Sequence, residues 1–259
     1  MNTTQRLFAA GQSIWYDNIE RRLLHNGEMA GMIARGEVRG VTSNPTIFQK
    51  AIVESQDYDA RLEALARAGW DAERIFWQLA VEDIQAAADL FRPLYEESGG
   101  GDGYVSLEVN PYLAHDAEGT LAEAKQLWQR VDRPNLMVKI PATEAGLPAV
   151  TAAIAAGVNV NVTLIFARER YMRVMDAYLC GLEERLARGL PLEGVASVAS
   201  FFVSRVDTKV DARLLSLDGQ GDALLGKAAI ANARLAYADF KEVVASERSQ
   251  ACLSYTSDA

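Results

Sequence analysis

The alternation of short β-like runs with longer helical runs is the feature that most restricts how this chain can fold. Such alternation builds a parallel sheet with helices packed outside it. Most of the β-like runs are rich in Val, Ile, Leu and Tyr and stop at a polar residue, as strands buried on both faces do at an open rim. We predict strands over residues 13–18, 40–44, 104–110, 136–141, 158–166 and 196–205.

Helical periodicity fills the intervals between these strands. Residues 99–103, GGGDG, are the one flexible stretch, and they precede a strand. A dinucleotide-binding glycine motif follows a strand and opens a helix, so a plain loop is predicted here. We predict helices over residues 20–35, 57–68, 72–97, 121–128, 146–156, 169–188, 207–215 and 222–245.

About six strands alternating with helices predict an α/β fold of the (β/α)₈ TIM-type barrel kind. Closure of that barrel needs eight strands, and only SERSQACLSYTSDA follows Ala245. The barrel is therefore expected to be incomplete, with residues 1–248 as the barrel domain and residues 249–259 as an atypical tail. An open doubly wound sheet is the alternative, because it needs no further strands.

The charge of the chain argues against several kinds of partner. Its formal net charge is −9 over 259 residues, so no extended basic face is available for a nucleic acid or an anionic membrane. The N-terminus lacks the basic start and apolar run of a signal peptide, and no stretch approaches a membrane span of about 20 apolar residues. A cytoplasmic protein is expected.

Cysteine and histidine are too sparse to suggest a metal centre. Cys180 and Cys252 form no CxxC pair, which gives no sign of a disulfide framework or a zinc site. The two histidines, His25 and His115, are too few for a His-based metal site. We expect neither a bound metal nor another cofactor.

Lys139 is the residue that points most strongly to chemistry. It lies in the run LMVKIPAT between Val138 and Ile140, whereas the other lysines fall in helical or loop segments. Burying an ammonium group in such a strand is costly unless the group is paired or loses its proton. Desolvation favours the neutral amine, which attacks a carbonyl to form an imine. The alternative is a structural lysine paired with an inward carboxylate.

Carboxyl groups stand at the ends of two other predicted strands. Asp17 in IWYDNI and Glu108 in SLEVNP each interrupt an apolar run. Dehydration of a carbinolamine and cleavage of a carbon–carbon bond both need proton transfer, which such groups supply. For either residue alone, capping of the next helix is an equal alternative, and the presence of Lys139 is what favours catalysis.

Amide and hydroxyl side chains recur at the same rim, which predicts a polyhydroxylated ligand such as a sugar. Asn161 and Thr163 stand at period two in one strand, so they point the same way and need partners. Asn44 precedes Pro45, and a simple turn is the alternative there. The predicted ligand-binding set of this kind comprises Thr42, Asn44, Asn161, Thr163 and Ser200.

Arg205 follows the run FFVS at the end of the last predicted strand, where a guanidinium can hold a phosphate by two hydrogen bonds. A surface ion pair with Asp207 or Asp211 is the alternative. Phe201 and Phe202 are expected to pack in the core, and one of them can also wall the site.

Six ordered segments resemble the transaldolase family, and its longer bacterial subgroup in particular. The resemblance runs from about residue 13 to about residue 245, and the segments TSNPTIF and VKIPAT carry it most specifically. The segments are YDNI, GVTSNPTIF, SLEVNPYLA, LMVKIPAT, VNVNVTLIF and VASFFVSRVD.

The resemblance implies a (β/α)₈ barrel of the class I aldolase kind and a cofactor-free reaction of the pentose phosphate pathway. In that reaction a dihydroxyacetone unit passes from sedoheptulose 7-phosphate to glyceraldehyde 3-phosphate, so sugar phosphates are the implied partners. Lys139 is similar to the Schiff-base lysine of the family and Asp17 to its general acid/base. Glu108 and Thr163 are similar to the residues that hold a catalytic water.

The same resemblance implies how the substrate is bound. Asn44, Asn161 and Ser200 are similar to ligands of the substrate hydroxyls and the Schiff-base region. Arg205 is similar to a phosphate ligand.

Fructose-6-phosphate aldolases are the alternative within the superfamily. These smaller enzymes carry Gln in place of Glu108 and Tyr in place of Phe202. Both positions therefore favour transfer of the dihydroxyacetone unit over simple aldol cleavage.

The C-terminus departs from the family, whose members continue through two more strands and a second phosphate-binding segment. The chain is therefore expected to be truncated relative to its family. A barrel that lacks its last strands exposes strand edges and part of its core unless a homo-oligomer or another chain covers them. An inactive or partner-completed barrel is thus the alternative to an active transaldolase.

Overall fold

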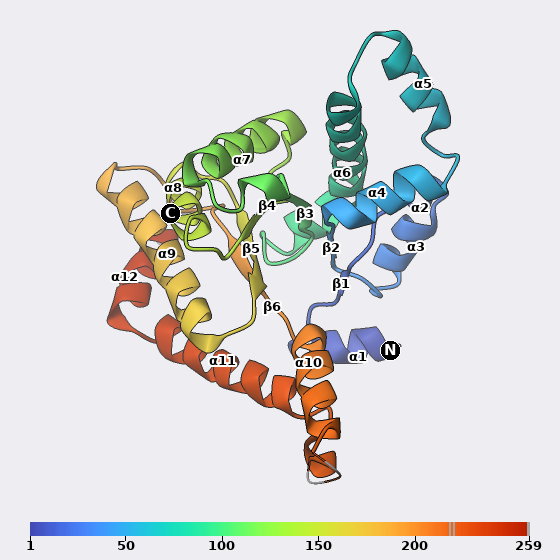
Figure 1. The fold of residues 1–259 in the computed structure, drawn as a ribbon. Coiled ribbons are helices and arrows are strands. Elements are labelled where there is room, and N and C mark those ends of the chain that lie inside the picture. Colours follow the sequence, from blue (N-terminus) through green and yellow to red (C-terminus); the bar gives the residue numbers. More distant parts are fainter. Residues whose placement is uncertain (218, 220, 258–259) are drawn as a thin grey trace. The chain divides into compact units, whose positions relative to one another are not determined.

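A computed structural model describes residues 1–217, 219 and 221–257 (Figure 1). The chain divides into two compact units. The N-terminal unit comprises Met1–Pro111 and Glu123–Val138, and the C-terminal unit comprises Tyr112–Ala122 and the chain from Lys139 onward. Within the described ranges, no helix has the length and apolar character that crossing a membrane requires.

The six strands of the described chain lie in one sheet in the order of the sequence, β1-β2-β3-β4-β5-β6. Strand β1 pairs parallel with β2, β2 with β3, and β5 with β6. The predicted α/β class is confirmed, and each predicted strand is present, although most are shorter than predicted. The strands are β1 (Trp15–Tyr16), β2 (Gly40–Thr42), β3 (Val105–Glu108), β4 (Leu136–Pro141), β5 (Val160–Ile165) and β6 (Ser197–Phe201).

The N-terminal unit is organised around α6, a long amphipathic helix over Ala72–Glu97. Asp71 caps this helix, because its carboxylate accepts a hydrogen bond from the Arg74 amide at 2.8 Å. The buried face of α6 includes Leu79 and Phe91, and the helix packs against β3 and the helices α2, α3 and α5. The remaining helices here are α1 (Thr3–Ala9), α2 (Arg21–His25), α3 (Glu28–Ala34), α4 (Pro45–Glu54) and α5 (Asp59–Arg67).

Two predicted helices are interrupted at glycines in the left-handed conformation, which strains any other residue. Gly27, with a φ of 87°, separates α2 from α3, so the prediction of one helix over residues 20–35 was wrong. Gly226, with a φ of 67°, precedes α11 (Ala228–Val244). The helix predicted over residues 222–245 therefore begins later, after a short 3₁₀ turn.

The C-terminal unit packs its helices on α9, which contacts α8, α11 and α12. Gly181 of α9 permits the close approach of α8, because a Cβ there would lie 2.6 Å from the Cβ of Ile154. The predicted tail, residues 249–259, is helical as far as Ser257, and residues 258–259 lie outside the described residues. The helices are α7 (Ala117–Val131), which spans both units, α8 (Gly146–Ala155), α9 (Arg168–Ala187), α10 (Ser204–Leu215), α11 and α12 (Glu247–Ser257), with a 3₁₀ turn at Pro111–Leu113.

Candidate active site

The predicted site residues of the N-terminal unit stand at the carboxyl ends of three paired strands. Thr42 and Glu108 are the last residues of β2 and β3, and both are half-buried. Asp17 follows β1 directly and is exposed. Because β1, β2 and β3 pair in parallel, these three ends share one edge of the sheet. That edge is where α/β folds place their chemistry.

Asn44 begins a helix rather than a simple turn. Its side chain accepts a hydrogen bond from the Ile47 amide at 3.0 Å, and Pro45 fills the first position of α4. Next to it, the buried Ser43 hydroxyl donates to the Ser106 carbonyl at 2.7 Å, which ties the end of β2 to β3. The cap therefore fixes the backbone that carries Asn44.

Glu123 supports the segment that follows β3, a role that the sequence analysis missed. Its carboxylate accepts a hydrogen bond from the Asn110 amide at 2.5 Å. Burial raises the pKa of Glu123, while the bond from Asn110 acts in the opposite direction. Only the helical periodicity of residues 117–131 could have indicated that Glu123 faces inward.

Lys139 is buried as predicted, with 6% of its surface exposed. Every residue of its strand, β4, is buried, and Val138 and Ile140 are fully enclosed. In the same unit, the Ala142 amide donates to the Thr163 carbonyl at 2.8 Å, which fixes the chain after β4 against β5. The lysine thus sits in a rigid, largely dry strand.

Asn161 of β5 and Ser200 of β6 are brought together. The Ser200 hydroxyl donates to the Asn161 side-chain oxygen at 2.8 Å, across parallel strands in which Asn161 pairs with Val198. Asn161 and Thr163 are each 2% exposed. The prediction that these polar groups need partners is met for Asn161, and one of its partners is itself a predicted ligand.

Strand β5 is irregular directly after Thr163. The pairing with β6 shifts register between Val162 and Ile165, and Leu164 has a φ of 60°. A left-handed leucine is strained, and bulges of this kind are over-represented beside active sites, where they re-aim side chains. The sequence gives no signal for it, because Gly and Asn are the residues expected at such a position.

Arg205 does not end a strand, so that placement was wrong. Strand β6 stops at Phe201, and Arg205 lies exposed in the first turn of α10. Its guanidinium carbon is 4.7 Å from the ring centroid of Phe202. Phe202 in turn packs against Phe166, with ring centroids 5.1 Å apart. The aromatic contact holds the guanidinium next to the end of β6.

Asp207 and Asp211 were the alternative ion-pair partners of Arg205, and each of them accepts a backbone hydrogen bond near the start of α11. The Asp207 carboxylate accepts a hydrogen bond from the Ala229 amide at 2.9 Å. The Asp211 carboxylate accepts from the Gly226 amide at 3.0 Å. Both acidic groups thereby hold the start of α11.

A metal centre does not emerge from the part of the chain that the structure describes. No group of three or more His, Cys, Asp or Glu side chains there is arranged to hold a metal ion. The predicted site residues offer an amine, carboxyl groups, hydroxyls, amides and a guanidinium.

Comparison with known proteins gives a consistent result. The family model described as transaldolase/fructose-6-phosphate aldolase matches residues 14–254. A transaldolase of Saccharopolyspora erythraea is 57% identical over 97% of this chain and 69% of its own length. Transaldolase 1 of Streptomyces avermitilis is 54% identical over 94% of this chain and 65% of its own length. A transaldolase of Thermobifida fusca is 55% identical over 94% of this chain and 67% of its own length. The chain thus spans about two thirds of the length of these relatives.

Proposed function

The chain belongs to the transaldolase/fructose-6-phosphate aldolase family, and from this premise we propose that it is a transaldolase. The reaction is the cofactor-free transfer of a dihydroxyacetone unit from sedoheptulose 7-phosphate to glyceraldehyde 3-phosphate. Sugar phosphates are its substrates. The observation that carries this proposal is Lys139, a lysine 6% exposed in a fully buried strand. The cytoplasmic location expected from the sequence stays a prediction.

Lys139 is the nucleophile of the proposed reaction. Its neutral amine attacks the ketone carbon of the donor, and loss of water leaves an iminium linked to the side-chain nitrogen. The iminium withdraws electrons from the bond between its α and β carbons. That bond breaks as the β-hydroxyl loses its proton, which releases an aldose and leaves an enamine on the lysine. The retained three-carbon enamine adds to the acceptor aldehyde, and hydrolysis of the new iminium frees the product. Burial in β4 supports this role, because the surrounding strand residues fix the position of the lysine and keep bulk water from the imine.

Proton transfers are assigned to the carboxyl groups at the other strand ends. Asp17 takes the proton of the donor hydroxyl as the carbon–carbon bond breaks and returns a proton to the acceptor. Glu108 and Thr163 hold the water needed for dehydration and hydrolysis. Asp17 and Glu108 stand at or next to the carboxyl ends of β1 and β3, and Thr163 lies in β5 directly before its irregularity, which supports these assignments.

Substrate hydroxyls are bound by amide and hydroxyl groups. The hydrogen bond between Ser200 and Asn161 fixes the orientation of both side chains. Thr42 and Asn44 serve the same purpose at the end of β2. Arg205, stacked on Phe202, binds the phosphate.

Transfer is favoured over simple aldol cleavage. Phe202 offers no hydroxyl at the position where the smaller aldolases carry Tyr, and its ring is occupied by Phe166 and Arg205. Glu108 is a carboxyl group where those enzymes carry Gln. Release of free dihydroxyacetone from fructose 6-phosphate in the absence of an acceptor would identify the aldolase instead.

Chemical trapping tests the proposal directly. Incubation with fructose 6-phosphate and borohydride should leave a reduced three-carbon adduct on Lys139, detected by peptide mass spectrometry. The Lys139→Met variant should lose the adduct, and the control Lys125→Met, at an exposed position of α7, should keep it. Labelling at another lysine, or none in the wild type, would contradict the assignment.

A partner-completed or inactive chain is the second candidate, and it is supported by incomplete coverage of the C-terminal unit. Every residue of β6, an end strand of the sheet order, is half-buried. Ile230, Leu235 and Tyr237 of α11 are exposed apolar side chains. Sedimentation of the isolated chain separates the two candidates, because a monomer that turns over substrate excludes completion by another chain.

A further inference from the structure

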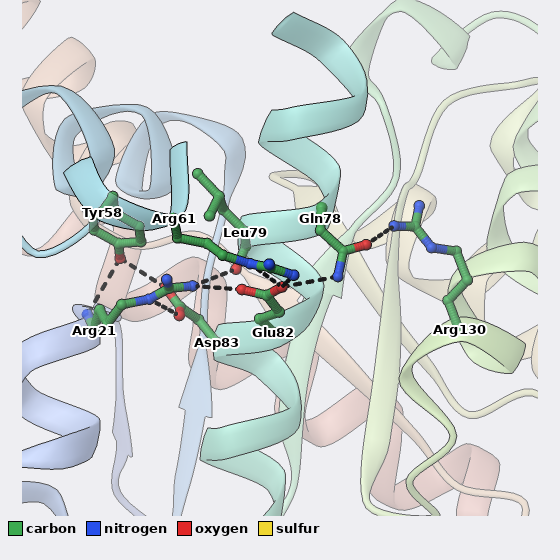
Figure 2. Close-up of polar contacts among 8 residues, drawn as sticks. All are labelled: Arg21, Tyr58, Arg61, Gln78, Leu79, Glu82, Asp83 and Arg130. Carbon is green, nitrogen blue, oxygen red and sulfur yellow. Dashed lines mark hydrogen bonds and ion pairs between the residues drawn. The ribbon is translucent and has the colours of Figure 1, made fainter. Parts of the chain in front are cut away.

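A buried polar network lies beside α2 in the N-terminal unit (Figure 2). Arg21, the first residue of α2, directs its guanidinium to α6, where Nε donates to the Asp83 carboxylate at 2.7 Å. The other end of the guanidinium reaches the Glu82 carboxylate at 3.2 Å and the Leu79 carbonyl at 3.4 Å. Asp83 is 1% exposed, so this ion pair is almost fully removed from water.

Tyr58 closes the network from the segment between α4 and α5. Its hydroxyl donates to the second oxygen of Asp83 at 2.7 Å and accepts from the Arg21 backbone amide at 3.2 Å. Its ring lies under the same guanidinium, at 4.6 Å. Glu20, the residue before α2, makes no capping hydrogen bond with its side chain. The Tyr58 hydroxyl therefore satisfies the first backbone amide of α2, that of Arg21.

Electrostatics fix the direction of these hydrogen bonds. Burial and the neighbouring Asp83 carboxylate raise the pKa of Tyr58 above its usual range, so its hydroxyl keeps its proton and remains a donor. The charge-assisted bonds from Arg21 compensate the buried carboxylate. A network whose donors and acceptors are all matched in this way is rigid.

The network holds one end of the segment that carries Asp17. At the other end, Tyr16 of β1 pairs in register with Val41 of β2. Between these two anchors, Ile19 is fully buried. The short chain from β1 to α2 is thus fixed on both sides, and Arg21 is the anchor on the helical side.

We propose that Arg21, Tyr58 and Asp83 are positioning residues, which set the geometry of Asp17 by anchoring the segment between β1 and α2 to α6. They act through Asp17 rather than on the substrate. The inference rests on the proposed function, because it takes Asp17 as the acid/base of that reaction.

Coupling between substitutions tests the positioning role. Tyr58→Phe removes the hydroxyl and keeps the ring, so kcat should fall about tenfold while KM changes less than about twofold. In an Asp17→Asn background the same change should lower kcat by less than about twofold, because the residue that Tyr58 positions is already disabled. Tyr178→Phe, which removes a comparable hydroxyl bonded to the Val195 carbonyl of the C-terminal unit, is the control and should leave kcat unchanged. Equal losses in both backgrounds would overturn the proposal.

Hydrogen exchange tests the anchoring separately from the chemistry. Tyr58→Phe should accelerate exchange of the amides of residues 17–21 about tenfold, with the amides of α6 unchanged. If borohydride trapping shows no adduct on Lys139, the proposed function fails, and exchange alone then decides whether the network anchors the segment. Arg21→Lys, which keeps the positive charge beside Asp83 and removes the forked guanidinium contact, replaces Tyr58→Phe if that variant does not fold. Unaltered exchange at residues 17–21 in the folded variant would overturn the proposal.

Discussion

The two units hold their predicted site residues by different physical means. In the N-terminal unit, the segment that carries Asp17 is anchored by charges, with Arg21 and Asp83 paired at 2.7 Å in the interior. In the C-terminal unit, Asn161 and Ser200 are held by a parallel strand ladder and by one neutral hydrogen bond of 2.8 Å. The stability of a buried charge network depends on every charged member. The stability of a strand ladder comes from many backbone hydrogen bonds, so the loss of one contact matters less.

This difference predicts how each region fails. A buried charge that loses its partner leaves an uncompensated charge in the interior, which destabilises far more than the loss of one neutral hydrogen bond. Lys139 belongs neither to the charge network nor to the neutral contacts of the ladder, because its proposed role is in the reaction and not in stabilising the fold. The following variants separate these three cases.

Replacement of the nucleophile should have the largest effect, and mainly on activity. Lys139→Met should lower turnover by at least about a thousandfold, because Met has no amine with which to form the imine. The melting temperature should fall only slightly, because Met keeps the length and packing of the buried side chain. Coupled turnover assays and calorimetry measure the two quantities. A variant that unfolds would instead support the structural-lysine alternative.

Breaking the arginine network should have the largest effect on stability. Asp83→Ala leaves the Arg21 guanidinium buried without its main partner, so the free energy of unfolding should fall by about 3–5 kcal/mol. Glu63→Ala is the matched control, because it removes an ion pair with Arg67 on the exposed side of α5 and should cost less than about 1 kcal/mol. Urea unfolding provides both values. Similar losses in the two variants would remove the distinction between the units.

The ladder should tolerate the loss of its neutral hydrogen bond. Ser200→Ala should lower the free energy of unfolding by about 0.5–1.5 kcal/mol, the net value of one such bond. Its KM for the sugar phosphate should rise, because Asn161 loses one of the groups that orient it. Urea unfolding and steady-state kinetics test the two parts. A loss as large as that of Asp83→Ala would mean that the ladder is as dependent on a single contact as the charge network.

Local patterns predicted the sheet and the longest helix well. Strand β4 and helix α6 have the bounds expected from the sequence. A short apolar run interrupted only by Lys139 predicts a strand, and a long amphipathic period predicts a helix. The simple turn that was the alternative for Asn44 and Pro45 is instead the start of α4, and the N-cap and Pro signals for that helix are present in the sequence. Gly27 ends α2 in a segment whose periodicity continues across it.

The contacts of the site residues could be predicted from the sequence only in part, because they join residues that are far apart in the chain. Arg21 and Asp83 are 62 residues apart. Asp83 is a charged residue on the buried face of α6, but nothing local identifies Arg21 as its partner. Asn161 was predicted to need a partner because an amide in an apolar strand must be satisfied. The identity of that partner, Ser200, became evident only from the strand order.

A surface ion cluster in the C-terminal unit should give the smallest effect, and it extends the comparison to charges that remain in water. The Glu144 carboxylate accepts hydrogen bonds from Arg173 at 2.6 and 2.7 Å and from Arg170 at 2.6 Å, which joins the segment before α8 to α9. These bonds, from Arg173 first and then Arg170, lower the pKa of Glu144 to about 2. Its side chain is 66% exposed, so solvent and salt screen the interaction.

The direction of the pH dependence follows from that lowered pKa. A carboxyl group with a folded-state pKa below its ordinary value of 4.5 stabilises the fold above that pH, and the contribution disappears as the pH falls from 4.5 towards 2. The difference in melting temperature between wild type and Glu144→Gln should therefore be small and positive at neutral pH, shrink across this range, and shrink at neutral pH on addition of salt. A difference that persists at high salt would mean that Glu144 acts by packing. A difference that disappears with salt would confirm the contrast with the network of Arg21, in which removal from water makes the ion pair costly to break.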